Sequence, residues 1–144
     1  MAAHNHAAFE WIHHEHVARD HGLTTPQLSV IRDVASSPSP TGVLSPIHVA
    51  ALAFADASTK DIKVSDGVFQ GLAKALETLV DDKEKDKSEK VEDLLVEAAA
   101  VVATYNMVSR FLVSLDVAGK SDDLVPYPFD KEDVRLRLHH FCLV

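Results

Sequence analysis

The chain has 144 residues, of which 47% are hydrophobic and 25% are charged, as is typical of one globular domain. Its formal net charge of −8 at pH 7 would repel a polyanion, which excludes nucleic-acid binding as the expected main role. The single cysteine, Cys142, cannot form an internal disulfide, a CxxC redox pair or a multi-thiolate zinc site.

No secretory or membrane segment is expected. The first residues are polar and rich in histidine, without the apolar centre of a signal peptide. The uninterrupted apolar stretches, such as residues 98–103, are too short to cross a bilayer. We therefore expect one cytoplasmic domain over residues 1–144, with no membrane contact.

Helical periodicity dominates the chain, because apolar residues recur three and four positions apart. In chain order, helices are predicted over residues 7–20, 27–34, 47–57, 68–80 and 90–115. The predicted N-caps are Thr25, Ser45, Ser65 and Ser88. The glycines predicted to end helices are Gly22 and Gly119. The last helix is apolar around so much of its surface that we expect it at the buried centre of the fold.

The segments between these helices read as loops. Residues 36–42 are rich in serine and proline, and residues 81–90 carry mixed charge without an apolar side chain, as expected of a solvated hinge between helices or a helix end. The C-terminus is ambiguous, because Asp130 could cap a helix through residue 138 while residues 134–140 alternate as in a strand. A short helix, or an arm that docks on a neighbouring subunit, is favoured there.

Histidines cluster at the N-terminus, and one of them has a carboxylate on the preceding helical turn. Six of the nine lie within the first 21 residues: His4, His6, His13, His14, His16 and His21. Glu10 and His14 are four residues apart and share one helix face, so the carboxylate could fix the imidazole tautomer and prepare a general acid or base. Trp11 would add an apolar wall. On spacing alone, an ordinary helix pair worth about 0.2–0.5 kcal/mol is the more common arrangement.

A metal site is the less favoured interpretation of the same cluster. His13 with His16, or Glu10 with His14, could act as a helical ligand pair. The segment lacks the HExxH spacing, however, and no third or fourth ligand is indicated. We therefore predict neither a metal nor a cofactor.

A second polar group lies in the long C-terminal helix. Asn106 and Arg110 are four apart on one face, next to Tyr105. They could be a satisfied buried asparagine and an ion-paired arginine, or they could hold a substrate carbonyl or carboxylate. The residues alone leave both possibilities open.

Four ordered motifs resemble the carboxymuconolactone decarboxylase-like proteins of the AhpD-like superfamily. Residues 9–24 are similar to that family's (Y/F)EWxxHxxxAxxxG(L/V)(S/T) segment, and residues 44–57 to its LSPxxxAALAYADAL helix. Val64-Ser65-Asp66 with Phe69 resembles its VSDxxF turn, and residues 101–112 resemble its YNMVxRxL helix. The resemblance covers residues 9–117 and leaves a divergent tail at 118–144.

The resemblance implies an all-α, AhpD-like helical bundle that assembles into trimers or hexamers, here with an N-terminally shortened chain. Redox members carry CxxCxxxH, but this chain has Ala7 and Glu10 at the thiol positions and keeps the histidine as His14. Without a thiolate, peroxidase activity is disfavoured. The decarboxylase branch has an ExxxH arrangement that Glu10 and His14 reproduce.

We therefore expect a cofactor-independent acid/base enzyme, decarboxylase-like, that acts on a small oxygenated organic acid or lactone. His14 would transfer the proton, Glu10 would orient it, and the substrate-binding residues would be Trp11, His13, Tyr105, Asn106 and Arg110. The alternatives are a non-catalytic oligomer with an assembly or partner-binding role and a histidine-rich metal-binding protein.

Overall fold

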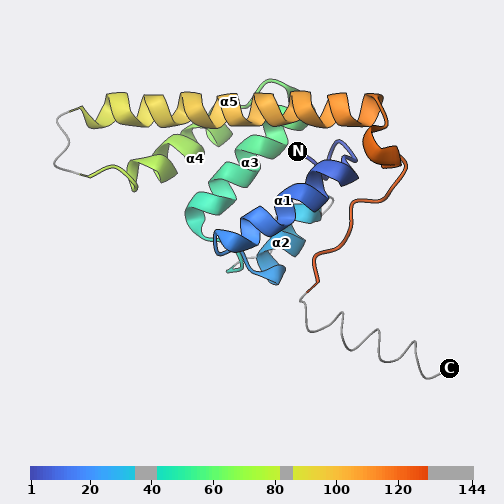
Figure 1. The fold of residues 1–144 in the computed structure, drawn as a ribbon. Coiled ribbons are helices and arrows are strands. Elements are labelled where there is room, and N and C mark those ends of the chain that lie inside the picture. The colour runs from blue at the N-terminus through green and yellow to red at the C-terminus, as the bar shows by residue number, and fades with distance from the viewer. Residues whose placement is uncertain (35–41, 82–85, 130–144) are drawn as a thin grey trace.

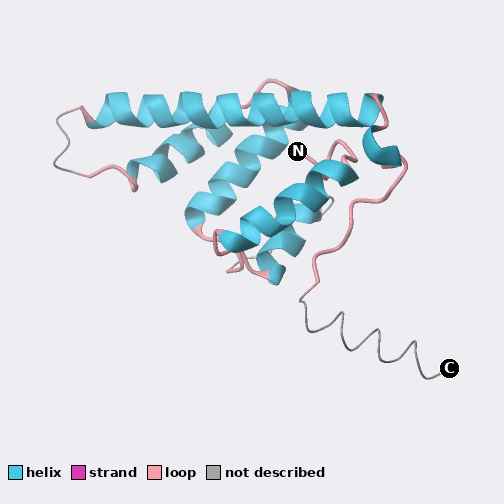
Figure 2. Cartoon of the chain, in the orientation of Figure 1, coloured by secondary structure: helices cyan, strands magenta, loops and turns pink. Residues whose placement is uncertain are grey.

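The computed structural model describes residues 1–34, 42–81 and 86–129, and its elements are all helical (Figure 1). They are α1 (Ala8–Asp20), α2 (Thr25–Arg32), α3 (Pro46–Asp61), α4 (Asp66–Glu77), α5 (Lys87–Ser114) and a 3₁₀ turn at Val117–Gly119. Figure 2 shows helices and loops but no strand in these ranges. The all-α fold class is confirmed. The predicted C-terminal helix or arm from Asp130 onward, and most of the loop at 36–42, lie outside the described residues.

Local sequence signals account for most helix boundaries. Ser45 caps α3, where its hydroxyl accepts a hydrogen bond from the His48 amide at 3.4 Å and Pro46 follows in the first turn. Gly22 follows α1 with a φ of 91°, a left-handed conformation that suits glycine. Ser65 precedes α4 as predicted.

Three predicted cap or stop residues were wrong, and α3 and α4 end at Asp61 and Glu77 instead of at residues 57 and 80. Thr24 caps α2, because its backbone amide donates to Gln27 Oε1 at 2.9 Å in a capping box, and Thr25 is the first helical residue. Asp86, not Ser88, precedes α5. Gly119 does not end α5, which stops at Ser114, but lies in the 3₁₀ turn that follows.

The core forms where α3, α4 and α5 meet. Its buried members are apolar side chains from these three helices: Phe54, Leu72, Leu76, Val91, Leu95 and Val102. The hairpin of α3 and α4 packs against α5, and α1 lies beside the C-terminal half of α5 with α2 next to it (Figure 1). Burial of these side chains supplies the main stabilisation, at about 1.5–3 kcal/mol for each fully buried one.

One face of α5 remains uncovered, contrary to the expectation of a central buried helix. Only 17% of its most apolar 18-residue stretch is buried, and Met107 is 63% exposed. The reason is topological, because the other helices pack on one side of α5 only (Figure 1). By length and composition α5 could cross a membrane, a criterion that core helices of soluble proteins also meet.

The residues before α1 dock on α3 and α5 through polar contacts. His4 Nε2 lies 2.8 Å from Asp56 Oδ1, and Asn5 Nδ2 donates to Asn106 Oδ1 at 3.0 Å. Asn106 Nδ2 in turn donates to Thr59 Oγ1 at 3.0 Å. Buried amides and hydroxyls require such partners, so this network fixes the path of the first residues.

The residues after the 3₁₀ turn run back along α1 and α2 of the same chain. Arg32 Nη2 donates to the Val125 carbonyl at 2.7 Å, and its guanidinium lies 3.6 Å from the Tyr127 ring centroid. Arg19 Nη2 donates to the Phe129 carbonyl at 3.2 Å. Two arginines therefore hold residues 125–129 on the first two helices.

The core predicts a contrast between two leucines of the α4 region. Leu72 is 1% exposed in the core, whereas Leu79 is 62% exposed beyond the end of α4. We expect Leu72→Ala to lower the free energy of unfolding by about 2–5 kcal/mol, because it leaves a cavity. Leu79→Ala should change it by less than about 0.5 kcal/mol. Urea unfolding followed by circular dichroism measures both, and equal losses would contradict this core assignment.

Candidate functional site

Glu10 is the buried acidic residue of the candidate site. It lies in the first turn of α1 and is 4% exposed. Ser109, near the C-terminal end of α5, is 0% exposed, and its hydroxyl is hydrogen-bonded to Glu10 Oε2. Its Oγ also lies 2.8 Å from the Tyr105 carbonyl oxygen, one helical turn earlier. The Glu10 carboxyl is thus held against α5 and shielded from water.

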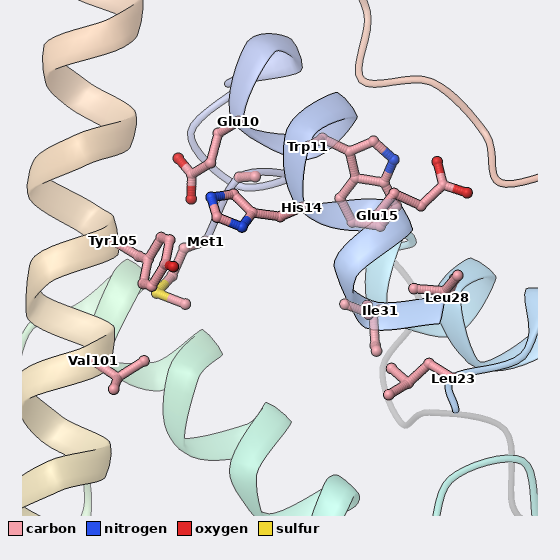
Figure 3. Close-up of a pocket in the computed structure, with 12 residues that line it drawn as sticks. Met1, Glu10, Trp11, His14, Glu15, Leu23, Leu28, Ile31, Val101 and Tyr105 are labelled. Atoms are coloured by element: carbon pink, nitrogen blue, oxygen red, sulfur yellow. The ribbon is translucent and has the colours of Figure 1, made fainter. Parts of the chain in front are cut away.

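A cavity of about 270 Å³ opens beside this contact, between α1, α2 and α5. Most of its walls are apolar, and its titratable lining groups are Glu10, His14, Glu15 and Tyr105. Figure 3 shows Glu10, Trp11 and His14 entering from α1, with Tyr105 and Val101 opposite them on α5. Its volume is slightly below the range of about 300–1,000 Å³ that is typical of small-molecule sites. Leu23, Leu28 and Ile31 contribute the wall on the α2 side.

His14 stands at the exposed side of the cavity. Its ring meets the Tyr105 ring edge-on, with centroids 5.1 Å apart and an interplanar angle of 85°. The Glu10 carboxyl and the His14 ring lie on the same side of α1, facing Tyr105 (Figure 3). Among the described residues the Glu10 carboxyl has its hydrogen bond with Ser109 and none with His14. The two groups therefore share the cavity but interact only through their charges.

Burial dominates the electrostatics of the Glu10 carboxyl. Loss of solvation raises the pKa of Glu10 above its ordinary value of 4.5. A Ser109 hydroxyl that donates to the carboxylate, the Met1 amino group and His14 oppose this rise in pKa without cancelling it. Burial also lowers the pKa of the Met1 amino group, against the opposing charges of Asp56 and Glu10. Glu15 is different, since it forms an ion pair with Arg19 at 2.7 Å.

The predicted substrate-binding residues separate into two groups. Trp11 and Tyr105 line the cavity together with Glu10 and His14. His13 lies outside it, because its ring stacks on Phe9 with centroids 4.1 Å apart. Asn106 belongs to the buried network with Asn5 and Thr59, and Arg110 is exposed outside the lining.

Trp11 contributes mainly apolar surface. Its Nε1 is buried without a hydrogen-bond partner, the one such side-chain atom in the described part of the chain. The nitrogen lies on the side of the indole that faces away from Glu10 and His14 (Figure 3). The indole N–H is therefore not directed at the same point as the two titratable groups.

Ser109 is the site residue that the sequence did not indicate. A single serine in an apolar helix carries no signal of its own, since serines back-bond to the helix in many proteins. One clue was available, because Ser109 lies four residues after Tyr105 and seven after Val102, on the face that turns toward the core. Met1 also lines the cavity and was not foreseen.

The histidines do not gather into a metal site in the part of the chain that is described. His4 is bonded to Asp56, and the rings of His13 and His21 donate from Nδ1 to the carbonyls of Phe9 and Val17, each at 2.8 Å. Within residues 1–34, 42–81 and 86–129, no three His, Cys, Asp or Glu side chains lie close enough to hold an ion together. The metal-binding alternative gains no support from these contacts.

Comparisons with known proteins identified no relative. No family model matches the chain, and no match was found among curated proteins or solved structures. The resemblance to carboxymuconolactone decarboxylase-like proteins therefore stays an expectation that rests on its four motifs.

Proposed function

We propose that the chain is a cofactor-independent acid/base enzyme of the carboxymuconolactone decarboxylase-like type, within the AhpD-like superfamily. Its substrate would be a small oxygenated organic acid or lactone. One observation carries the proposal: Glu10 and His14, on successive turns of α1, both open into one largely apolar cavity. Titratable groups with shifted pKa values in such cavities are typical of sites that transfer protons.

The positions of the two groups support different roles. His14 is exposed at the cavity edge, where its imidazole can exchange protons with water. Glu10 lies deeper, where loss of solvation favours its neutral form. Together they provide one proton carrier in contact with solvent and one inside the cavity.

The apolar walls support the same chemistry. Trp11 and Tyr105 keep the local dielectric low, which strengthens interactions of the titratable groups with a developing charge. Loss of CO₂ or opening of a lactone leaves an enolate or oxyanion that must receive a proton. No charged cofactor is required when a neutral acid stands beside that position.

His14→Gln tests the proposal, because glutamine keeps size and polarity but cannot titrate. Against a panel of lactone carboxylic acids and β-keto acids, we expect turnover to fall by about 10²–10⁴-fold. CO₂ release and deuterium incorporation from D₂O measure it. His13→Gln is the matched control, since its ring lies outside the cavity on Phe9 and turnover should be retained. Full activity of the His14 variant would exclude this mechanism.

A second candidate function, assembly without catalysis, is favoured by the uncovered face of α5. Its exposed apolar residues follow the three–four spacing of one stripe: Val96, Ala100, Ala103, Met107 and Phe111. Residues 98–115 contain a single charged side chain, Arg110. Such a surface is normally covered, and a second copy of the same helix is complementary to it because the alanines permit close approach. The enzyme would use the same face to form its homo-oligomer, a trimer or hexamer.

Met107→Lys tests the assembly, because it places a charge in the middle of the stripe. We expect the wild type to sediment as an oligomer at micromolar concentrations and the variant to shift toward the monomer. Leu124→Lys is the control, since Leu124 is apolar and even more exposed, at 86%, but lies off α5. A wild-type chain that stays monomeric across this range would contradict both the interface and the assembly function.

A further inference from the structure

The Ser109 hydroxyl contacts more acceptor oxygens than it has hydrogens to donate. Ser109 Oγ has two oxygen neighbours within hydrogen-bonding distance, Glu10 Oε2 and the Tyr105 carbonyl oxygen. A serine hydroxyl carries one hydrogen, and a backbone carbonyl carries none. Ser109 can therefore donate to only one of these two oxygens at a time.

Only one protonation state satisfies both contacts. If Glu10 is ionised, Ser109 donates to its carboxylate, and two oxygens with lone pairs face each other at the 2.8 Å contact with Tyr105. If Glu10 is neutral, its O–H donates to Ser109 Oγ, and Ser109 donates to the Tyr105 carbonyl. Ser109 is 0% exposed, so bulk water does not reach its hydroxyl to supply the missing hydrogen.

We propose that Glu10 is held as a neutral carboxylic acid in the resting protein and that Ser109 is the positioning residue that holds it so. This inference rests on the proposed function and changes the role of Glu10 within it. Glu10 becomes a proton donor inside the cavity, in place of the anion that was expected to orient His14. A neutral Glu10 also allows a small organic anion to enter without repulsion from this wall.

The surrounding charges fit this assignment. The titratable groups that face Glu10 are the Met1 amino group before α1, His14 on α1 itself and Tyr105 on α5. Asp56 on α3 lies near the Met1 amino group and offsets its charge. Glu15, the other carboxylate of the cavity, is already neutralised by Arg19. No arginine or lysine contributes to the lining that would hold Glu10 in its ionised form.

The arrangement also provides a balanced proton-transfer step. The Glu10 O–H bond breaks, its proton bonds to the enolate carbon or oxyanion of the ligand, and the electron pair stays on the carboxylate. The Ser109 hydroxyl then turns its hydrogen from the Tyr105 carbonyl to Glu10 Oε2, which stabilises the new charge. A proton taken from water by His14 restores the acid, since His14 reaches both the solvent and the cavity.

The pH dependence of stability measures the protonation of Glu10 without any substrate. A carboxyl whose pKa is raised in the folded state destabilises the fold as pH rises from its unfolded pKa to its folded pKa. Glu10→Gln keeps the neutral form at every pH. Above about pH 4.5 the wild type should therefore lose stability relative to this variant. The ratio of the variant's unfolding equilibrium constant to that of the wild type should fall by up to tenfold per pH unit, and it should level off at the folded pKa of Glu10.

The control is Glu97→Gln, because Glu97 is exposed on α5. Its stability relative to the wild type should not change over the same pH range. A Glu10→Gln difference that is constant between pH 4.5 and 7 would overturn the proposal. If Glu10→Gln does not fold, a ¹³C titration of the Glu10 carboxyl carbon in the wild type decides it, since an ionised carboxylate at pH 6 contradicts the proposal.

Ser109 is tested by the pH at which this difference levels off. Ser109→Ala removes the hydroxyl that accepts the Glu10 proton and passes a hydrogen bond on to the Tyr105 carbonyl. If Ser109 holds Glu10 neutral, the levelling point of Ser109→Ala against Ser109→Ala/Glu10→Gln should move to lower pH. Ser109→Thr keeps the hydroxyl and should restore the wild-type profile. An unchanged levelling point in the alanine variant would show that Ser109 only fills space.

These outcomes are separable from those of the proposed function. If Glu10 titrates as expected while His14→Gln keeps full turnover, the enzyme proposal fails and the neutral Glu10 stands. If Glu10 is ionised at neutral pH while His14→Gln loses turnover, the enzyme proposal stands and the role of Glu10 as the internal acid fails.

Discussion

The hydrogen bond between Glu10 and Ser109 is the contact on which the geometry of the site depends. It joins residues 99 positions apart in the sequence and places the first turn of α1 against the C-terminal part of α5. Because α1 is held there, Trp11 and His14 line the same cavity as Tyr105 of α5. A polar contact buried this deeply is stable only when each of its hydrogens is donated to an acceptor. The protonation state of Glu10 therefore affects the structure as well as the chemistry of the site.

The polar network of the first residues complements that contact. Asn106 bonds to both Asn5 and Thr59 and so connects the N-terminal segment, α3 and α5. Met1 and Ala2 then reach the cavity wall. Asn106 thus supports the cavity by positioning the segments that enclose it, although its own side chain does not line it.

The sequence predicted the helices and half of the site, for identifiable reasons. The spacing of apolar residues and the capping residues are local signals, so all five helices and the caps at Ser45 and Ser65 were predicted. One helix carries Glu10, Trp11 and His14, so their proximity follows from their spacing in the sequence. Ser109 and Met1 reach the cavity through tertiary contacts, which no local pattern encodes. The exposure of α5 was missed for the same reason, because an apolar surface does not reveal whether its own chain covers it.

The arginine contacts of the C-terminal segment have a consequence for the order of folding. Arg32 binds the Val125 carbonyl across 93 residues of sequence, and Arg19 binds that of Phe129 across 110. Contacts between such distant positions form late, since the intervening chain must first be ordered. During synthesis, α1 and α2 leave the ribosome long before the residues that brace them. The wall of the cavity therefore reaches its final shape only after residues 125–129 have emerged.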